Sequence, residues 1–127
     1  MSNRPEGRGV ARAALERRRA DVAARVDSLR RELDAVQRLR SENSDDDEHD
    51  PEGATTSQLW SHSAGLVADA ERELSELDAA LSRVASGDYG TCRECGGPIS
   101  SDRLEARPAA AFCITCARRG GAGPRRG

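Results

Sequence analysis

The amino-acid sequence predicts a mainly α-helical protein, an antiparallel two-helix coiled-coil hairpin followed by a small four-cysteine module. Three observations predict this fold class. Two segments repeat apolar residues every seven positions, an acidic stretch separates them, and four cysteines follow in two C-x-x-C pairs. The 127 residues include one Trp, one Tyr and one Phe, and the apolar residues are mostly Ala, Leu and Val. A thick globular core is therefore not expected, and a helix seam and a bound metal are the expected sources of stability.

The first predicted helix spans residues 10–40, after a flexible polar tail at residues 1–9. Its apolar residues occupy the a and d positions of a heptad and charged residues fill most other positions, which is typical of a coiled-coil helix. The stripe consists of Leu15, Val22, Val26, Leu29, Leu33 and Val36.

An acidic stretch at residues 41–54 holds seven acids and no base. Within it, Asp50 and Pro51 predict the start of a second helix, with Asp50 as N-cap and Pro51 at the first helical position. Gly87 follows the second stripe and is a natural left-handed C-cap. This stripe consists of Val67, Ala70, Leu74, Leu77, Leu81 and Val84.

The short connection between the two predicted helices favours a hairpin over residues 10–86. Helices of similar length joined by about ten residues fold back on each other and bury their apolar stripes. The alternatives are separate helices and a parallel coiled-coil dimer. The hairpin interpretation predicts a monomer.

The four cysteines are Cys92, Cys95, Cys113 and Cys116, with seventeen residues between the two pairs. This spacing predicts a zinc-ribbon or treble-clef-like zinc finger at residues 87–118 that binds one zinc ion. Gly96 and Gly97, just after the first pair, allow left-handed backbone, so that amide hydrogens can point at the thiolates. A shell of four thiolates leaves no position for water, so the zinc is expected to be structural. Disulfides, a rubredoxin-like iron site and a redox-switching thiol cluster are the alternatives.

The N-terminus has no apolar secretion signal and no apolar run reaches the roughly 20 residues of a membrane span. Together with the paired cysteines, this predicts a soluble, cytoplasmic protein without a membrane partner. All twenty basic residues are arginine, and residues 119–127 are expected to form a disordered basic tail.

The cysteine region resembles the DksA/TraR family of bacterial transcription regulators. The residues that carry the resemblance run without a gap from 87 to 116: Gly87-x-Tyr89-Gly90-x-Cys92-x2-Cys95-Gly96-x2-Ile99, then Arg103-Leu104-Glu105-Ala106-Arg107-Pro108, then Cys113-x2-Cys116. The preceding hairpin fits the same architecture. The resemblance implies that the protein binds RNA polymerase rather than specific DNA sequences. It also implies that the coiled coil enters the secondary channel of the polymerase and that an acidic tip approaches the active site.

The resemblance also assigns roles to residues of the tip. The family's longer members carry Asp-x-x-Asp-x-Ala there, and counting back from Cys92 places His49, Glu52 and Ala54 at these positions. Asp47 and Asp50 supply the two acids after a small shift of register. The expected active-site-facing residues are therefore Asp47, Asp50, Glu52 and Ala54.

A second implied site is a contact with guanosine tetraphosphate. Arg107 matches one basic residue of the family's alarmone site, whereas Glu76 and Ala117 stand at two other positions of that site. The resemblance thus assigns an alarmone contact to Arg107 alone.

Two other functions are weighed against polymerase binding. One is a zinc-ribbon module that binds nucleic acid through arginines, although the acidic hairpin would repel phosphate and few aromatics are present for base stacking. The other is an interaction module without a polymerase role. An enzyme is not expected, because the thiolate shell is closed and no nucleophile with a base is visible. The candidate nucleic-acid contacts are Arg93, Arg103, Arg107, Arg118, Arg119, Arg125 and Arg126.

Overall fold

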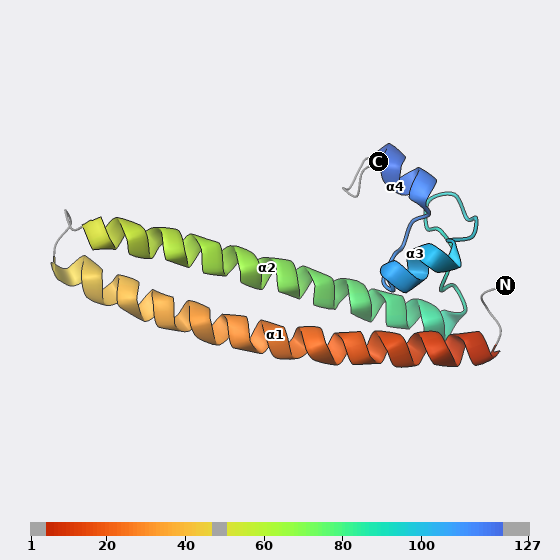
Figure 1. Ribbon diagram of the computed structural model, residues 1–127, viewed down its shortest axis with the longest axis horizontal. Coiled ribbons are helices and arrows are strands. Elements are labelled where there is room, and N and C mark those ends of the chain that lie inside the picture. Colours follow the sequence, from red (N-terminus) through yellow and green to blue (C-terminus); the bar gives the residue numbers. More distant parts are fainter. Residues whose placement is uncertain (1–4, 47–50, 121–127) are drawn as a thin grey trace. The chain divides into compact units, whose positions relative to one another are not determined.

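The computed structural model describes the backbone of residues 5–46 and 51–120, and the side chains of residues 7–42 and 55–120. Within this part of the chain, the helices are α1 (Pro5–Asp46), α2 (Pro51–Ser86), α3 (Ser101–Ala106) and α4 (Ile114–Gly120) (Figure 1). An isolated antiparallel bridge joins Thr91 to Pro98. The predicted fold class, a mainly helical chain with a long helical hairpin before a four-cysteine module, is confirmed.

Helix α1 extends beyond its predicted bounds at both ends. It begins at Pro5, so residues 5–9 are helical and not a loose tail, and it continues to Asp46. Proline is favoured in the first helical turn, and residues 41–46 contain no Pro or Gly, so polarity alone does not end the helix. Helix α2 begins at Pro51, as predicted, and the connection is shorter than the ten residues expected.

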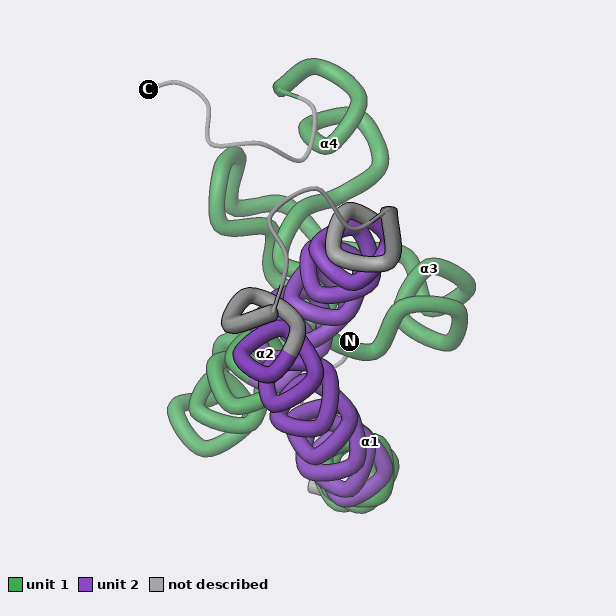
Figure 2. Tube along the Cα trace, turned by 90° about the vertical axis from the view of Figure 1, so that its left-hand side faces the viewer, with its two compact units in different colours: residues 1–19, 75–127 green, residues 20–74 purple. Residues whose placement is uncertain are grey.

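Packing divides the chain into two compact units (Figure 2). Unit 1 contains residues 1–19 and 75–127, and unit 2 contains residues 20–74. This division differs from the predicted boundary between residues 86 and 87, because the C-terminal part of α2 packs with the cysteine module. The predicted bounds of the hairpin, residues 10–86, and of the zinc-finger module, residues 87–118, remain a prediction.

In unit 2, the apolar stripes of α1 and α2 form the seam of the hairpin. Val22, Val26, Val67 and Ala70 are buried. An exposed ion pair between Arg30 and Glu71 links the two helices. The other stripe residues of this unit, Leu29, Leu33, Val36 and Leu74, are half-buried.

Nearer the connection, the seam of unit 2 becomes more polar. Thr56 and Ser63 are buried at positions that continue the heptad of Ala70. The guanidinium of Arg40 lies 4.9 Å from the centroid of the Trp60 ring. Trp60 therefore packs inside the hairpin, in a cation–π contact with the facing helix.

In unit 1, the N-terminal part of α1 and the C-terminal part of α2 supply the core. Leu15, Leu77, Ala80 and Val84 are each no more than 2% exposed. An ion pair between Arg19 and Asp78 links the two helices at the surface. None of the described helices combines the length and apolarity that a bilayer span requires.

Helix α2 ends in a Schellman motif at Gly87. The amide of Gly87 donates to the carbonyl of Val84 at 3.3 Å, and the amide of Asp88 donates to that of Arg83 at 2.8 Å. Gly87 has φ of +85°, a conformation that favours glycine. The predicted C-cap is confirmed, and it turns the chain directly into the cysteine module.

Candidate metal centre

The first cysteine pair lies in a tight turn between Thr91 and Pro98. The amide of Cys92 donates to the carbonyl of Gly97 at 2.7 Å. The amide of Gly96 donates to the carbonyl of Cys92 at 3.0 Å. Gly96 adopts φ of +77°, as predicted. Gly97 does not adopt this conformation, but its amide points at a thiolate as expected and donates to the Sγ of Cys95 at 3.4 Å. One left-handed residue is enough to close the turn.

The second pair lies at the start of α4. Cys113 immediately precedes the helix and Cys116 is buried within it. The amide of Arg93 donates to the carbonyl of Ala111 at 2.9 Å, which joins this segment to the first turn. Ligands from a turn and from a helix start correspond to the treble-clef-like alternative of the prediction.

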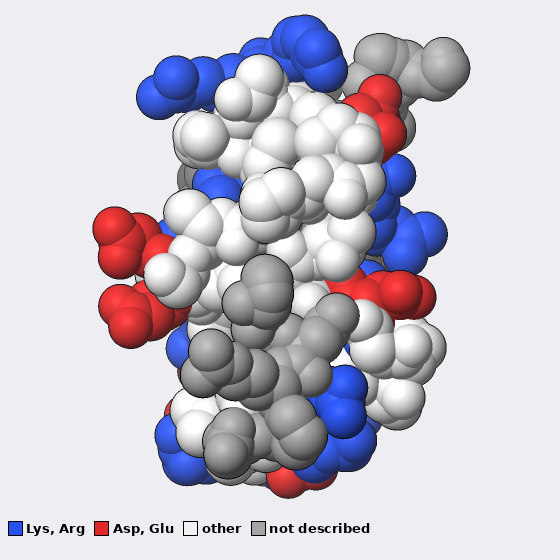
Figure 3. All heavy atoms as spheres, turned by 90° about the vertical axis from the view of Figure 1, so that its right-hand side faces the viewer, with Lys and Arg blue, Asp and Glu red and all other residues white. Residues whose placement is uncertain are grey.

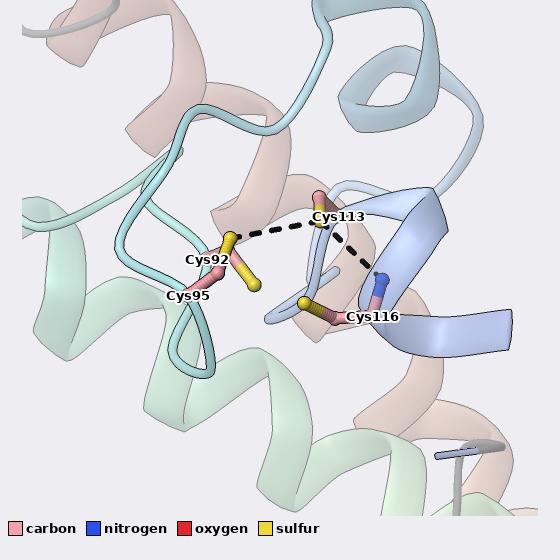
Figure 4. A group of neighbouring side chains, drawn as sticks. All are labelled: Cys92, Cys95, Cys113 and Cys116. Carbon is pink, nitrogen blue, oxygen red and sulfur yellow. Dashed lines mark hydrogen bonds between the residues drawn. The ribbon is translucent and has the colours of Figure 1, made fainter. Parts of the chain in front are cut away.

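The four sulfurs gather around one point. They all lie within 4.8 Å of one another, and the Sγ atoms of Cys95 and Cys113 are 3.9 Å apart. Figure 4 shows the sulfurs of the two pairs facing the space between the turn and α4. Four sulfurs at about 2.3 Å from a tetrahedral zinc would be about 3.8 Å apart. The arrangement therefore fits a zinc ion.

Each sulfur accepts a hydrogen bond from its surroundings. The amide of Glu94 donates to Cys92 and that of Gly97 to Cys95, both at 3.4 Å. The amide of Cys116 donates to Cys113 at 3.5 Å. For Cys116 the donor is the guanidinium of Arg119 at 3.7 Å. Such donors stabilise thiolate charge and orient the ligands around a metal.

The four thiols do not ionise alike. Burial raises the pKa of Cys92, but backbone hydrogen bonds from Cys95, Cys113 and Glu94 outweigh burial and lower the pKa to about 6. Burial, with hydrogen bonding to the other thiols, raises the pKa of Cys116 to about 12. Four negative charges at this spacing repel one another, so a cation is needed to hold all four as thiolates.

A small apolar cluster supports the centre. Cys92, Ile99 and Cys116 are buried together, and Leu104 and Phe112 pack against them. Phe112 therefore lies beside the metal site. Cys95, by contrast, is exposed. The site is buried on one side and reaches the surface on the other.

Two hydrogen-bonded side chains link the end of the hairpin to the segment between α3 and α4. The guanidinium of Arg83, which is 7% exposed, lies 3.4 Å from the carbonyls of Ala109 and Ala110. The hydroxyl of Tyr89 donates to the carbonyl of Pro108 at 2.7 Å. Sequence analysis missed Arg83, because an arginine next to a heptad position is normally a solvated side chain.

One of the arginines predicted to contact nucleic acid is bound to the backbone of the cysteine module itself. Arg103 donates from Nε to the carbonyl of Phe112 at 2.8 Å, so its role is to hold the segment before Cys113. Arg93, Arg107, Arg118 and Arg119 are exposed, and residues 125 and 126 lie outside the described part. On the face in Figure 3, basic side chains stand at the margins, interrupted by acidic ones, around a broad uncharged centre.

The predicted tip and alarmone residues are described only in part. Asp47, His49 and Asp50 lie outside the described residues, and for Glu52 and Ala54 only the helical backbone of α2 is described. Arg107 is exposed and caps the C-terminus of α3 by donating its amide to the carbonyl of Arg103 at 2.7 Å. The tip and the alarmone contact therefore remain predictions.

Comparison with known proteins identifies the class of the cysteine module. Residues 87–119 match the family model of the prokaryotic dksA/traR C4-type zinc finger. A protein of Caulobacter vibrioides, "RNA polymerase-binding transcription factor DksA", is 48% identical over 52 residues, which are 40% of this chain and 37% of that protein. The protein of the same name from Escherichia coli K12 is 45% identical over 49 residues, 38% of this chain and 32% of that protein. The matched segments thus cover about a third of the length of these relatives.

A solved structure extends the similarity to the hairpin. The transcription factor DksA2 from Pseudomonas aeruginosa matches with a TM-score of 0.76 and 28% identity, over 92% of this chain and 84% of that chain. The fold and the site thus define a C4-type zinc-finger protein with a helical coiled-coil hairpin. The chain belongs to the DksA/TraR family and has all four cysteines of its zinc finger.

Proposed function

We propose that this protein is an RNA polymerase-binding transcription regulator that acts without sequence-specific binding to DNA. The observation that carries the proposal is the similarity of the zinc finger to factors named for polymerase binding, on a hairpin similar to that of a transcription factor. We further propose that the hairpin enters the secondary channel and brings its connection close to the active site.

The charge distribution supports this orientation. Residues 20–74 hold fourteen acids against six arginines, whereas residues 1–19 and 75–127 hold fourteen arginines against eight acids. A crowded set of like charges destabilises an isolated hairpin through repulsion. A partner site rich in cations would offset this repulsion, which explains why the acidic residues are present. In this proposal Asp47, Asp50 and Glu52, followed by Ala54, face the active-site metal of the polymerase.

The zinc finger has a structural role in this proposal. One zinc ion bound by Cys92, Cys95, Cys113 and Cys116 has a complete shell and cannot activate water, so we propose no catalytic activity. Its effect is to fold unit 1, which receives the ends of both long helices. The protein acts as a monomer in the cytosol, where bacterial polymerase works, and Arg107 supplies its alarmone contact.

A direct binding measurement tests the proposal. The purified, zinc-loaded chain should bind core RNA polymerase, and the complex should change the lifetime of open complexes at a responsive promoter. Binding should compete with other factors that occupy the secondary channel. The proposal is contradicted if the chain does not bind polymerase but binds duplex DNA in a mobility-shift assay with an affinity that falls steeply with salt. Such a salt dependence is expected when phosphate contacts release counterions. That result would favour the nucleic-acid module instead.

A further inference from the structure

Exposed leucines gather on one edge of the hairpin in unit 2. Leu39, Leu59 and Leu66 are 49%, 46% and 38% exposed, although leucine is among the residues most often buried. The other large apolar side chains that the structure leaves exposed, Val10 and Ile114, belong to unit 1. A single exposed leucine needs no explanation, but a group of them on one edge marks an interaction surface.

Helix geometry places the three leucines on the same edge. Leu59 and Leu66 are seven residues apart and therefore lie in one line along α2. Arg40 and Trp60 face each other across the hairpin, and Leu39 and Leu59 directly precede them. When two helices are antiparallel and two of their residues face each other, the residue before each of these two lies on the same side of the helix pair. Leu39 thus stands beside Leu59, across the seam.

The rim of this leucine edge is acidic. Glu32 and Glu42 stand in line with Leu39, seven residues before and three after it, and Asp69 stands three residues after Leu66. All three side chains are exposed. Residues 60–65, between the two leucines of α2, include no arginine, and Arg40, next to Leu39, lies over the ring of Trp60. An exposed ion pair joins Asp69 of this rim to Arg72.

We propose that the leucine edge, formed by Leu39, Leu59 and Leu66, docks on an apolar surface of RNA polymerase that is flanked by basic side chains. This inference rests on the proposed function and assigns a surface to it. The acidic rim selects the partner's charge, and the leucines supply the apolar contact, which in protein interfaces carries much of the binding energy. The two pairing stripes of unit 2 face each other and are buried or half-buried, whereas the three leucines of the edge are exposed.

The test compares two glutamine variants in their affinity for purified core polymerase. The first carries Leu39→Gln, Leu59→Gln and Leu66→Gln, and we expect its Kd to rise about tenfold or more. The matched control carries Val10→Gln, which removes an exposed apolar group outside both the edge and the zinc finger, and its Kd should stay within about twofold of the wild type. Glutamine keeps helix propensity, so far-UV circular dichroism and Tm should be unchanged in both.

A third variant separates docking from folding. Glu32→Gln with Glu42→Gln leaves every leucine in place and should weaken binding at low salt more than at high salt, because only the rim charge is removed. Wild-type affinity in the triple leucine variant would overturn the leucine edge while leaving polymerase binding intact. Failure of the wild type to bind polymerase would overturn both proposals. A wild-type dimer in sedimentation that the triple variant abolishes would assign the edge to a second copy of this chain and likewise overturn the inference.

Discussion

At the scale of single residues, Tyr89 shows how the hairpin is joined to the zinc finger. Its ring is buried and its hydroxyl donates to the carbonyl of Pro108 at 2.7 Å. Tyr89→Phe should reduce the free energy of unfolding by about 1 kcal/mol, because it leaves the half-buried carbonyl of Pro108 without its donor. Chemical denaturation of both proteins at equal zinc content measures the loss. An unchanged midpoint would mean that water replaces the hydroxyl.

The same tyrosine predicts a dependence on alkaline pH. Burial raises the pKa of Tyr89 above its ordinary value of about 10. The folded state therefore prefers the neutral phenol, and this contribution is fully present below pH 10. It is lost as pH rises from about 10 through the raised pKa. Between these values the wild type should lose stability faster than Tyr89→Phe, as urea midpoints across the range would reveal.

A ligand substitution tests the structural role of the metal. Cys95→Ser should release zinc and unfold the segment from residue 89 to 120, since metal binding and folding are coupled. The long helices should keep most of their far-UV signal. Zinc content by mass spectrometry and circular dichroism measure the two effects. Glu94→Gln is the control, because the neighbouring sulfur is bound by the backbone amide of Glu94 and not by its carboxylate.

At the scale of elements, the seam between α1 and α2 should carry the stability of the hairpin. Leu77 is 1% exposed, so Leu77→Ala should cost about 2–4 kcal/mol. Leu29 is half-buried, and Leu29→Ala should cost less. Arg38→Ala, at an exposed position, should change stability by less than about 0.5 kcal/mol. Thermal unfolding orders the three, and equal small effects would show that the helices do not pair as described.

Charges between the two helices also favour the hairpin over a parallel dimer. Arg19 pairs with Asp78 in unit 1 and Arg30 with Glu71 in unit 2, each time with the arginine on α1 and the acid on α2. A parallel dimer of identical chains would instead set arginine-rich α1 against its own copy. Each exposed pair contributes little energy, but the repulsion in the alternative arrangement adds to the specificity.

At the scale of the whole molecule, we expect binding and regulation to be separable. Replacing Asp47, Asp50 and Glu52 with Asn, Asn and Gln should leave polymerase affinity within several-fold of the wild type, because the rest of the hairpin and the zinc finger supply the contact area. The effect on initiation should disappear, since charge in an enclosed channel acts more strongly than on an open surface. Affinity and open-complex lifetime, measured side by side, test this. If the triple variant gives the same open-complex lifetime as the wild type, the acidic connection has no role in regulation and is only a solvated turn.

Much of this protein was predictable because the relevant signals are local in the sequence. The heptads of Leu15 and Leu77 indicate which faces are buried, and Gly87 marks the end of α2, since both depend only on residues within a few turns. The pairs Cys92–Cys95 and Cys113–Cys116 identify the metal site by ligand type and spacing. Helix ends were less accurate: α1 includes residues 5–9 and 41–46, because polar residues do not by themselves stop a helix.

The sequence by itself thus determined the two stripes, the four ligands and the charge of each segment, all of which depend on residue identity and spacing. Only the tertiary structure decided which distant groups meet. It brings Arg83 to the carbonyls of Ala109 and Ala110, directs Arg103 to Phe112, and sets Arg40 over Trp60. These contacts depend on how turns and helices pack in three dimensions. The positions of the arginines in the sequence therefore do not predict which carbonyl or ring each one contacts.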